Sequence, residues 1–254
     1  MRGFVRAFKA EVLKGAHAAP RKIALVAPLP FCLLGILASG LLDGGGAGGA
    51  GFATYGWNWW YVLMLPVSVA LMCASVANID AKQRLRSVLD LPCLPRGVLV
   101  AKAVYVLALA FTANLVVMVA ALVARLGGGG APAVFASILM VPILTLAVGW
   151  MIPAGLFLTV RFGTLAGIAG PLVMQIALGI ALADSGIWWA IPMAADMRIA
   201  SPIIGVAPSG IPLMPGDPMG ALDGTWFLAL VVAIAAGAAL TALVAAWFNK
   251  REAA

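Results

Sequence analysis

The chain has 254 residues, of which 64% are hydrophobic and 10% are charged, whereas soluble domains carry roughly 25% charged residues. Because a water-soluble fold cannot hide that much apolar surface, we predict an integral membrane protein. The formal net charge of +7 could suggest a nucleic-acid partner, but on so apolar a chain it more often records orientation in a membrane. The three cysteines have the spacing of neither a disulfide framework nor a metal site.

The N-terminal segment precedes the first long apolar stretch. Phe4, Val5, Phe8 and Val12 recur at helical spacing among basic residues. This pattern predicts an amphipathic helix over 1–20 that lies in the inner membrane interface. A frayed basic tail is the alternative.

Six apolar stretches are each long enough to cross the roughly 30 Å hydrocarbon layer of a bilayer as a helix. They run over 23–42, 59–79, 98–123, 134–160, 165–183 and 226–248. We therefore predict an all-α polytopic protein, a single transmembrane domain over 1–254 with about six transmembrane helices. Its last external loop, over 184–224, is long.

The placement of the basic residues orients these spans. Six spans with a cytoplasmic N-terminus put fourteen of the sixteen Lys and Arg residues inside and leave Arg125 and Arg198 outside. Because basic residues concentrate in cytoplasmic loops, we predict that both termini are cytoplasmic.

Two glycine-rich runs, over 44–56 and 127–130, lack the Gly-Lys-Ser/Thr ending of a phosphate-binding loop. We predict flexible external turns for both. Away from the span ends no Asp, Glu, Lys, Arg or His is present, and Asp184 lies just beyond the end of the fifth span. This argues against a secondary transporter, because such proteins usually bind their driving ion with ionisable groups at bilayer depth. Motifs of ATPases, zinc hydrolases and serine hydrolases are also missing, so we predict a protein that is not an enzyme.

The basic loop after the second predicted span carries an apolar stripe. Leu85, Val88 and Leu89 share one side of a short helix expected over 82–91, which Pro92 stops. The stripe favours a helix that docks on another protein over a plain linker.

Tryptophans gather at outer span ends, with Trp57, Trp59 and Trp60 around Asn58. An aromatic belt explains such residues, and contact with a substrate is the alternative.

Four short segments carry a resemblance to a known family. They are the run Trp57-Asn-Trp-Trp-Tyr, the pair Leu65-Pro66, the segment from Arg84 to Pro92, and Ala101-Lys102. In these segments, in its size and in its six-span layout, the chain resembles the permease subunits of lantibiotic-immunity ABC transporters. Many members carry Glu in the basic loop where this chain has Asp80.

The resemblance implies the membrane-spanning permease of an ATP-driven exporter that expels lantibiotic peptide from the bacterial plasma membrane and so gives the producer self-immunity. The implied partners are two copies of a separate ABC ATPase, which would bind the ATP and Mg, and a second permease, identical or a sister. No cofactor, metal ion or nucleic acid is expected on this chain. The residues expected to couple to the ATPase are Arg84, Leu85, Arg86, Val88, Leu89, Leu91 and Pro92, and the substrate-facing candidates are Trp57, Asn58, Trp59, Trp60 and Arg198. An ABC permease for another lipid or drug, a non-transporting sensor subunit and a membrane-embedded transferase are the alternatives.

Overall fold

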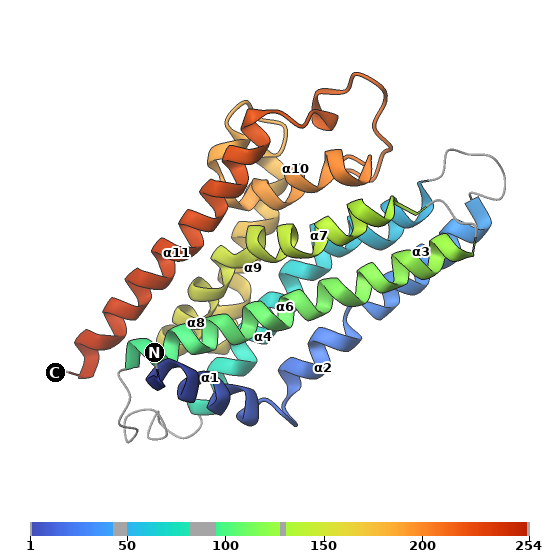
Figure 1. The fold of residues 1–254 in the computed structure, drawn as a ribbon. Coiled ribbons are helices and arrows are strands. Elements are labelled where there is room, and N and C mark those ends of the chain that lie inside the picture. The colour runs from blue at the N-terminus through green and yellow to red at the C-terminus, as the bar shows by residue number, and fades with distance from the viewer. Residues whose placement is uncertain (1, 43–49, 82–94, 128–130, 253–254) are drawn as a thin grey trace.

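The computed structural model describes residues 2–42, 50–81, 95–127 and 131–252, and this part of the chain is a bundle of helices without a named strand (Figure 1). The helices on the N-terminal side are α1 (Arg2–Lys14), α2 (Ala19–Val26), α3 (Leu29–Leu42), the π-helical η2 (Ala53–Asn58) and η3 (Trp60–Met64), α4 (Leu65–Ala81) and α6 (Pro95–Leu126). They are followed by α7 (Val134–Ala147), η4 (Val148–Trp150), α8 (Met151–Phe162), α9 (Thr164–Leu182), η5 (Trp188–Ala190), α10 (Pro192–Ile204), η6 (Pro218–Gly220) and α11 (Gly224–Glu252).

Six of the described segments are long and apolar enough to cross a membrane, which confirms that part of the prediction. They are Ala19–Leu41, Ala53–Ile79, Arg96–Leu126, Val134–Phe162, Thr164–Leu182 and Gly224–Asn249. In the first span, Pro28 and Pro30 lie where α2 ends and α3 begins, and neither can donate the backbone hydrogen bond of a regular helix. A 3-10 turn, η4, interrupts the fourth span. Each of these two spans is therefore built from more than one helix.

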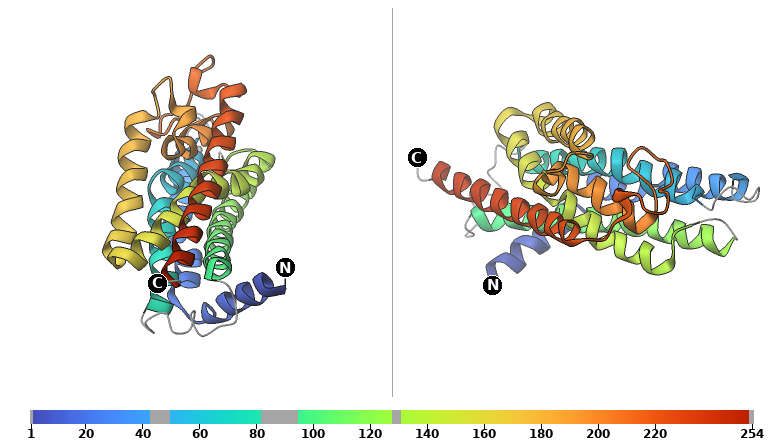
Figure 2. Two further views of the ribbon diagram at one scale, coloured as in Figure 1. Left: turned by 90° about the vertical axis from the view of Figure 1, so that its left-hand side faces the viewer. Right: turned by 90° about the horizontal axis from the view of Figure 1, so that it is seen from above.

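The termini lie at one end of the bundle, and the segment that contains α10 lies at the other (Figure 1). Figure 2 shows in two further views that α10 and the chain after it cover this second end. Both termini lie at the same end because the chain crosses the bundle an even number of times.

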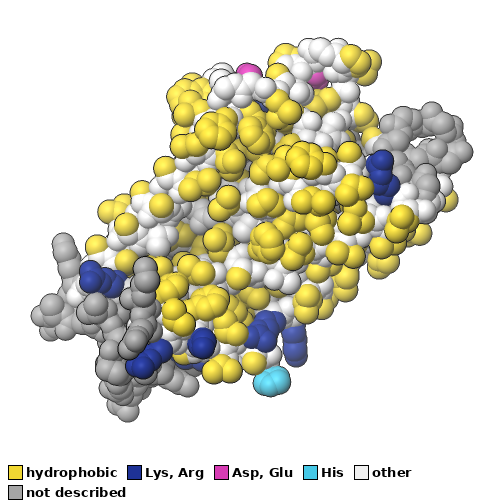
Figure 3. Space-filling view, in the orientation of Figure 1, with side chains coloured by type: hydrophobic (Ala, Val, Ile, Leu, Met, Phe, Trp, Pro, Cys, Tyr) yellow, Lys and Arg dark blue, Asp and Glu magenta, His cyan; other side chains and the backbone are white. Residues whose placement is uncertain are grey.

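The core of the bundle is centred on α4, which packs against α2, α6, α8 and α9. Its buried side chains include Leu65, Val69, Met72 and Val76. A helix that is apolar on all sides and buried in a bundle does not need a polar face. The face of the bundle seen in Figure 3 is also largely apolar, and most basic side chains on it lie toward the end where the termini are. This distribution is typical of a protein whose middle faces lipid.

Glycines allow close contact between neighbouring helices. The Gly163 backbone has φ +97° at the turn between α8 and α9. At Gly167 a Cβ atom would lie 2.8 Å from the backbone nitrogen of Thr159, so only glycine permits this spacing. Small residues at helix contacts are the usual way for membrane helices to pack.

The helix α1 is attached to the bundle at the end where the termini lie. Glu11 forms an ion pair with Lys102 of α6, with 2.8 Å between Oε2 and Nζ, and both side chains are buried. Arg21 of α2 donates to Val12 O of α1 at 2.6 Å and to the hydroxyl of Tyr105 of α6 at 3.3 Å. Phe4 remains exposed on α1. The amphipathic helix predicted over 1–20 is thus helical over Arg2–Lys14 and is fixed by a buried charge pair.

One sequence-based expectation was wrong in part. Residues 51–56, expected in a flexible turn, are helical, and Gly51 packs so closely on α3 that a Cβ would lie 2.8 Å from the Ser39 nitrogen. The long connection predicted over 184–224 lies between the last two candidate spans and contains η5, α10 and η6. Pro192 at the start of α10 and Gly205 in the left-handed conformation at its end fix the bounds of that helix.

Candidate functional site

The second span begins with an unusual backbone. Residues 53–58 and 60–64 are π-helical before the chain continues as α4. π-helical turns are rare, and where they occur inside helices they are frequent at functional sites. This segment contains the Trp-Asn-Trp-Trp motif and lies at the end of the bundle opposite the termini. We therefore take the motif and the chain that covers it as the candidate site.

The structure places the four residues of the motif in different environments. The indoles of Trp57 and Trp60 are completely buried, and Asn58 is only 4% exposed. Trp59 is 48% exposed. In this conformation Trp59 is thus the member of the motif that a ligand can reach, and an aromatic belt does not account for Trp57 and Trp60.

The segment 205–213 covers the motif, and we call it the outer cap. It is folded on itself by hydrogen bonds from Ala207 N to Ile211 O at 2.8 Å and from Leu213 N to Gly205 O at 2.9 Å. Two hydrogen bonds hold it on the second span. Asn58 Nδ2 donates to Pro208 O, and Thr54 Oγ1 donates to Gly210 O, each at 3.3 Å.

These two bonds are long, since donor and acceptor atoms in protein hydrogen bonds usually lie 2.7–3.2 Å apart. Gly210 has φ +87°, and a Cβ at this position would lie 3.5 Å from Asn58 Nδ2. The outer cap is therefore fitted closely to the motif but bonded to it only weakly.

Three of the buried polar atoms without a hydrogen-bond partner belong to the π-helical start of the second span. Trp57 Nε1, Asn58 Oδ1 and the Tyr61 hydroxyl make no hydrogen bond among the described residues. Nearly all buried polar groups in native proteins are hydrogen-bonded, so each exception calls for a physical reason. A ligand or a second conformation that satisfies these three atoms would supply such a reason.

Trp60 has a structural role instead. Its Nε1 donates to Asn114 Oδ1 of α6 at 2.8 Å, and Asn114 Nδ2 donates to Thr145 Oγ1 of α7 at 3.0 Å. All three residues are buried. This chain of hydrogen bonds joins three spans and fixes the start of the second one.

A second buried network runs to α10. Trp150 Nε1 donates to Gln175 Oε1 at 3.0 Å, and Gln175 Nε2 donates to both carboxylate oxygens of Asp196, at 2.8 and 2.9 Å. Burial raises the pKa of Asp196 from 3.8 to about 7, because removal from water disfavours the charged form. The sequence analysis did not find this acid, although Pro192 and Gly205 mark a helix around it.

The remaining predicted site residues lie elsewhere. Arg198 is also on α10, and its guanidinium lies 5.0 Å from the ring centroid of Trp188, a cation–π contact. The whole predicted coupling segment lies outside the described residues, and this includes Arg84, Leu85, Arg86, Val88, Leu89, Leu91 and Pro92. No group of three His, Cys, Asp or Glu residues that could hold a metal ion occurs in the described ranges.

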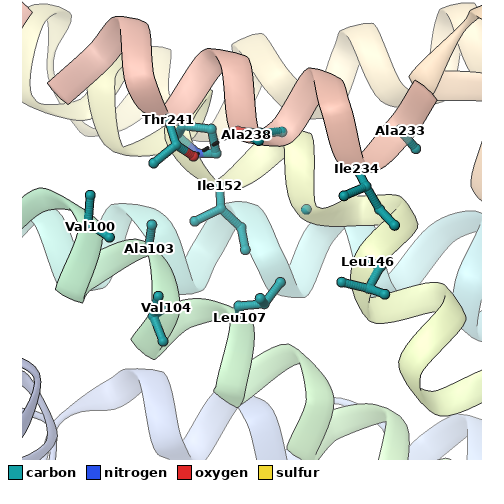
Figure 4. A pocket seen from close by; sticks show the side chains of 13 residues that line it. Val100, Ala103, Val104, Leu107, Leu146, Ile152, Ala233, Ile234, Ala238 and Thr241 are labelled. Atoms are coloured by element: carbon teal, nitrogen blue, oxygen red, sulfur yellow. Dashed lines mark hydrogen bonds between the residues drawn. The ribbon is translucent and has the colours of Figure 1, made fainter. Parts of the chain in front are cut away.

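A groove along α6 has an almost entirely hydrophobic lining (Figure 4). Leu107 of α6, Leu146 of α7 and Ile234 of α11 project into this space of about 220 Å³. Its single hydroxyl, from Thr241, is used within α11, where it donates to Gly237 O at 2.7 Å. The groove can hold hydrocarbon but offers no group for catalysis.

No protein-family model, no curated protein and no solved structure matches this chain. The arguments about its function therefore rest on the residues and their geometry.

Proposed function

We propose that the chain is the membrane-spanning permease subunit of an ATP-driven exporter, which expels lantibiotic peptide from the bacterial plasma membrane and so protects the producing cell. The observation that carries the proposal is the buried aromatic and polar motif under a weakly bonded outer cap. An amphiphilic peptide in the outer leaflet offers both apolar side chains and backbone polar groups. Such a ligand suits Trp57 and Asn58, which combine aromatic surface with unused hydrogen-bonding atoms.

Access to this site requires movement of the outer cap. The cap is held by two hydrogen bonds of 3.3 Å, and net contributions of such bonds are about 0.5–1.5 kcal/mol each. Val206 of the cap is also completely buried in the core, and its exposure on opening costs about 1.5–3 kcal/mol. The closed and open states of the cap would then differ by roughly 3–6 kcal/mol. An exporter needs this kind of two-state element, because a ligand or a partner can shift only an equilibrium that its binding energy can reach.

The energy would come from a separate ABC ATPase, present in two copies and carrying ATP and Mg. The segment 82–91 is proposed as its docking helix. A second permease, identical or a sister, would complete the assembly. Two observations support cytoplasmic termini. The six candidate spans put both termini on one side, and Arg125 lies at the end opposite most of the basic residues, which concentrate in cytoplasmic segments.

The surface of α1 supports a position in the inner interface. Phe4, Val5 and Leu13 are exposed apolar side chains, and Arg6 and Lys9 are exposed beside them. Helices of this kind insert their apolar side among lipid chains and place their basic side chains at the headgroups. The Glu11–Lys102 ion pair would couple such a helix to α6.

One observation favours the alternative, export of another lipid or drug. The groove of Figure 4 is lined by apolar side chains and by Thr241, whose hydroxyl is used within α11, and it would accept an acyl chain without any peptide-specific contact. The two proposals differ in the site that they use, which makes them separable by mutation.

The test compares two exposed aromatic residues at opposite ends of the bundle. Trp59 is 48% exposed and Phe162, in the last turn of α8, is 64% exposed. In cells that express the permease with its partner ATPase, Trp59→Ala should lower resistance to the peptide severalfold. The control Phe162→Ala, at matched protein level, should keep it. Full resistance in Trp59→Ala would contradict a substrate site at the motif.

A further inference from the structure

The helix α10 carries a carboxylate into the bundle without a cation to balance it. Asp196 is completely buried, in a segment outside the six candidate spans. Its oxygens accept from Gln175 Nε2, and Oδ1 also accepts from the backbone nitrogen of Met197 at 2.8 Å. Each of these donors is neutral, and neutral donors do not balance a buried negative charge.

Among the described residues, no element packed against α10 places a basic side chain beside Asp196. It packs against α7, α9 and α11, and against η3, η4, η5 and η6. The helices α7 and α9 contain no titratable residue, and the basic residues of α11 are at its far end. Arg198, on α10 itself, lies over Trp188. Asp217 precedes η6 and Asp223 precedes α11, and both are acids.

The remaining titratable neighbour is Tyr61 of η3, which lies close to both Asp196 and Ser201. The Tyr61 hydroxyl is one of the buried groups without a hydrogen bond. The Tyr61 oxygen can accept a hydrogen bond from the protonated carboxyl group of Asp196, so the neutral form has a candidate partner close by.

We propose that Asp196 is a proton-binding site that controls the seating of α10: the bound proton keeps the helix in the bundle, and its loss favours release. The ligand is a proton and not a metal cation, because N–H donors point at the carboxylate and would be repelled by a cation there. The outer cap follows α10 directly in the chain, so release of α10 loosens the cap over Asn58. This inference does not depend on what the protein transports.

The direction of the pH effect follows from burial. Because burial raises the pKa of Asp196 from 3.8 to about 7 in the seated state, the seated state binds the proton more tightly than the released state. The seated state is therefore most populated at low pH. Between roughly pH 4 and pH 7 the equilibrium constant for seating falls by up to tenfold per pH unit. Above pH 7 the effect levels off. The ratio of released to seated α10 should rise by roughly 100-fold between pH 5 and pH 8.

Thiol labelling measures this ratio in the full-length protein. In a background with Cys32, Cys73 and Cys93 changed to alanine, a single cysteine replaces Ala195, which is buried on α10. A maleimide added from outside should label it only when α10 is released. A second protein with a cysteine at Ile211, which is exposed, gives the reactivity of a free thiol at each pH. The corrected labelling rate should rise by roughly 100-fold from pH 5 to pH 8.

The variant Asp196→Asn keeps the shape of the side chain and cannot ionise. Its corrected labelling rate should stay constant over the same range, while the control Asp217→Asn, in the same external segment, should behave as wild type. A constant rate in the wild type, or a pH-dependent rate in Asp196→Asn, would overturn the proposal.

Infrared difference spectroscopy of the wild-type protein supplies a measurement that does not depend on how the variants fold. A protonated carboxyl band that disappears with a midpoint near pH 7 is expected. If carboxyl groups titrate only near pH 4, Asp196 is not the proton site.

Discussion

The buried ion pair between α1 and α6 gives a sharp prediction about the N-terminal helix. Changing Glu11 to Gln removes the carboxylate that lies 2.8 Å from Lys102 Nζ and 3.1 Å from Lys14 Nζ. Loss of one partner from a buried pair costs about 3–5 kcal/mol, because the other charge stays buried without compensation. We take the lower end, about 3 kcal/mol, because the pair lies near the end of the bundle. Hydrogen exchange of the α1 amides should then become roughly 150-fold faster.

A double variant tests the cause of this effect. Replacing Lys102 by Met in the Glu11→Gln background removes the buried cation that has lost its Glu11 partner, so part of the lost protection should return. Lys22→Met, which removes an exposed cation of α2, should leave α1 exchange unchanged. The reasoning is refuted if Glu11→Gln exchanges like wild type, or if the double variant exchanges as fast as the single one.

Three further predictions concern packing, hydrogen bonding and assembly. Gly167→Ala should destabilise the detergent-solubilised protein by several kcal/mol in thermal unfolding, because its Cβ would meet the backbone of α8; Gly170→Ala should cost less, because the nearest atom there, at 2.8 Å, ends a leucine side chain. Asn114→Leu leaves the indole N–H at the start of the second span unpaired and should lower the unfolding free energy by about 1–3 kcal/mol in denaturant titration. Replacing Leu85 and Leu89 by Asp should release the partner ATPase during co-purification, and unchanged recovery of the ATPase would show that 82–91 is an ordinary linker.

The spans were predictable because their signal is local. A run of about 20 apolar residues is sufficient evidence for a membrane helix, and the structure has six such helices. The start of the second span was predicted too late, at residue 59 instead of 53. Glycine in this run was taken as a turn signal, whereas Gly51 and Gly56 serve close helix packing. The prediction was wrong because glycine is common both in turns of soluble proteins and at contacts between membrane helices.

The candidate site was predictable only in part, because burial depends on distant segments. The Trp-Asn-Trp-Trp motif could be selected from the sequence. The contact between Asn58 and Pro208 of the outer cap could not be predicted, because the two residues are 150 positions apart. Asp196 looked like a loop residue, and its partner Gln175 lies on another helix, 21 residues earlier. Capping signals can indicate α10, but no pattern in a single sequence indicates which acid will be buried.

ATP-driven release of membrane-bound peptide is the most direct test of the proposed function. The permease and its partner ATPase would be reconstituted in vesicles that carry a fluorescent lantibiotic in the bilayer, and the loss of fluorescence from the membrane would be followed after addition of ATP and Mg. We expect release into the medium that requires both proteins and hydrolysable ATP, and that is reduced by Trp59→Ala but not by Phe162→Ala. Peptide that stays in the membrane with wild-type permease, while the ATPase is bound and active, would contradict the account.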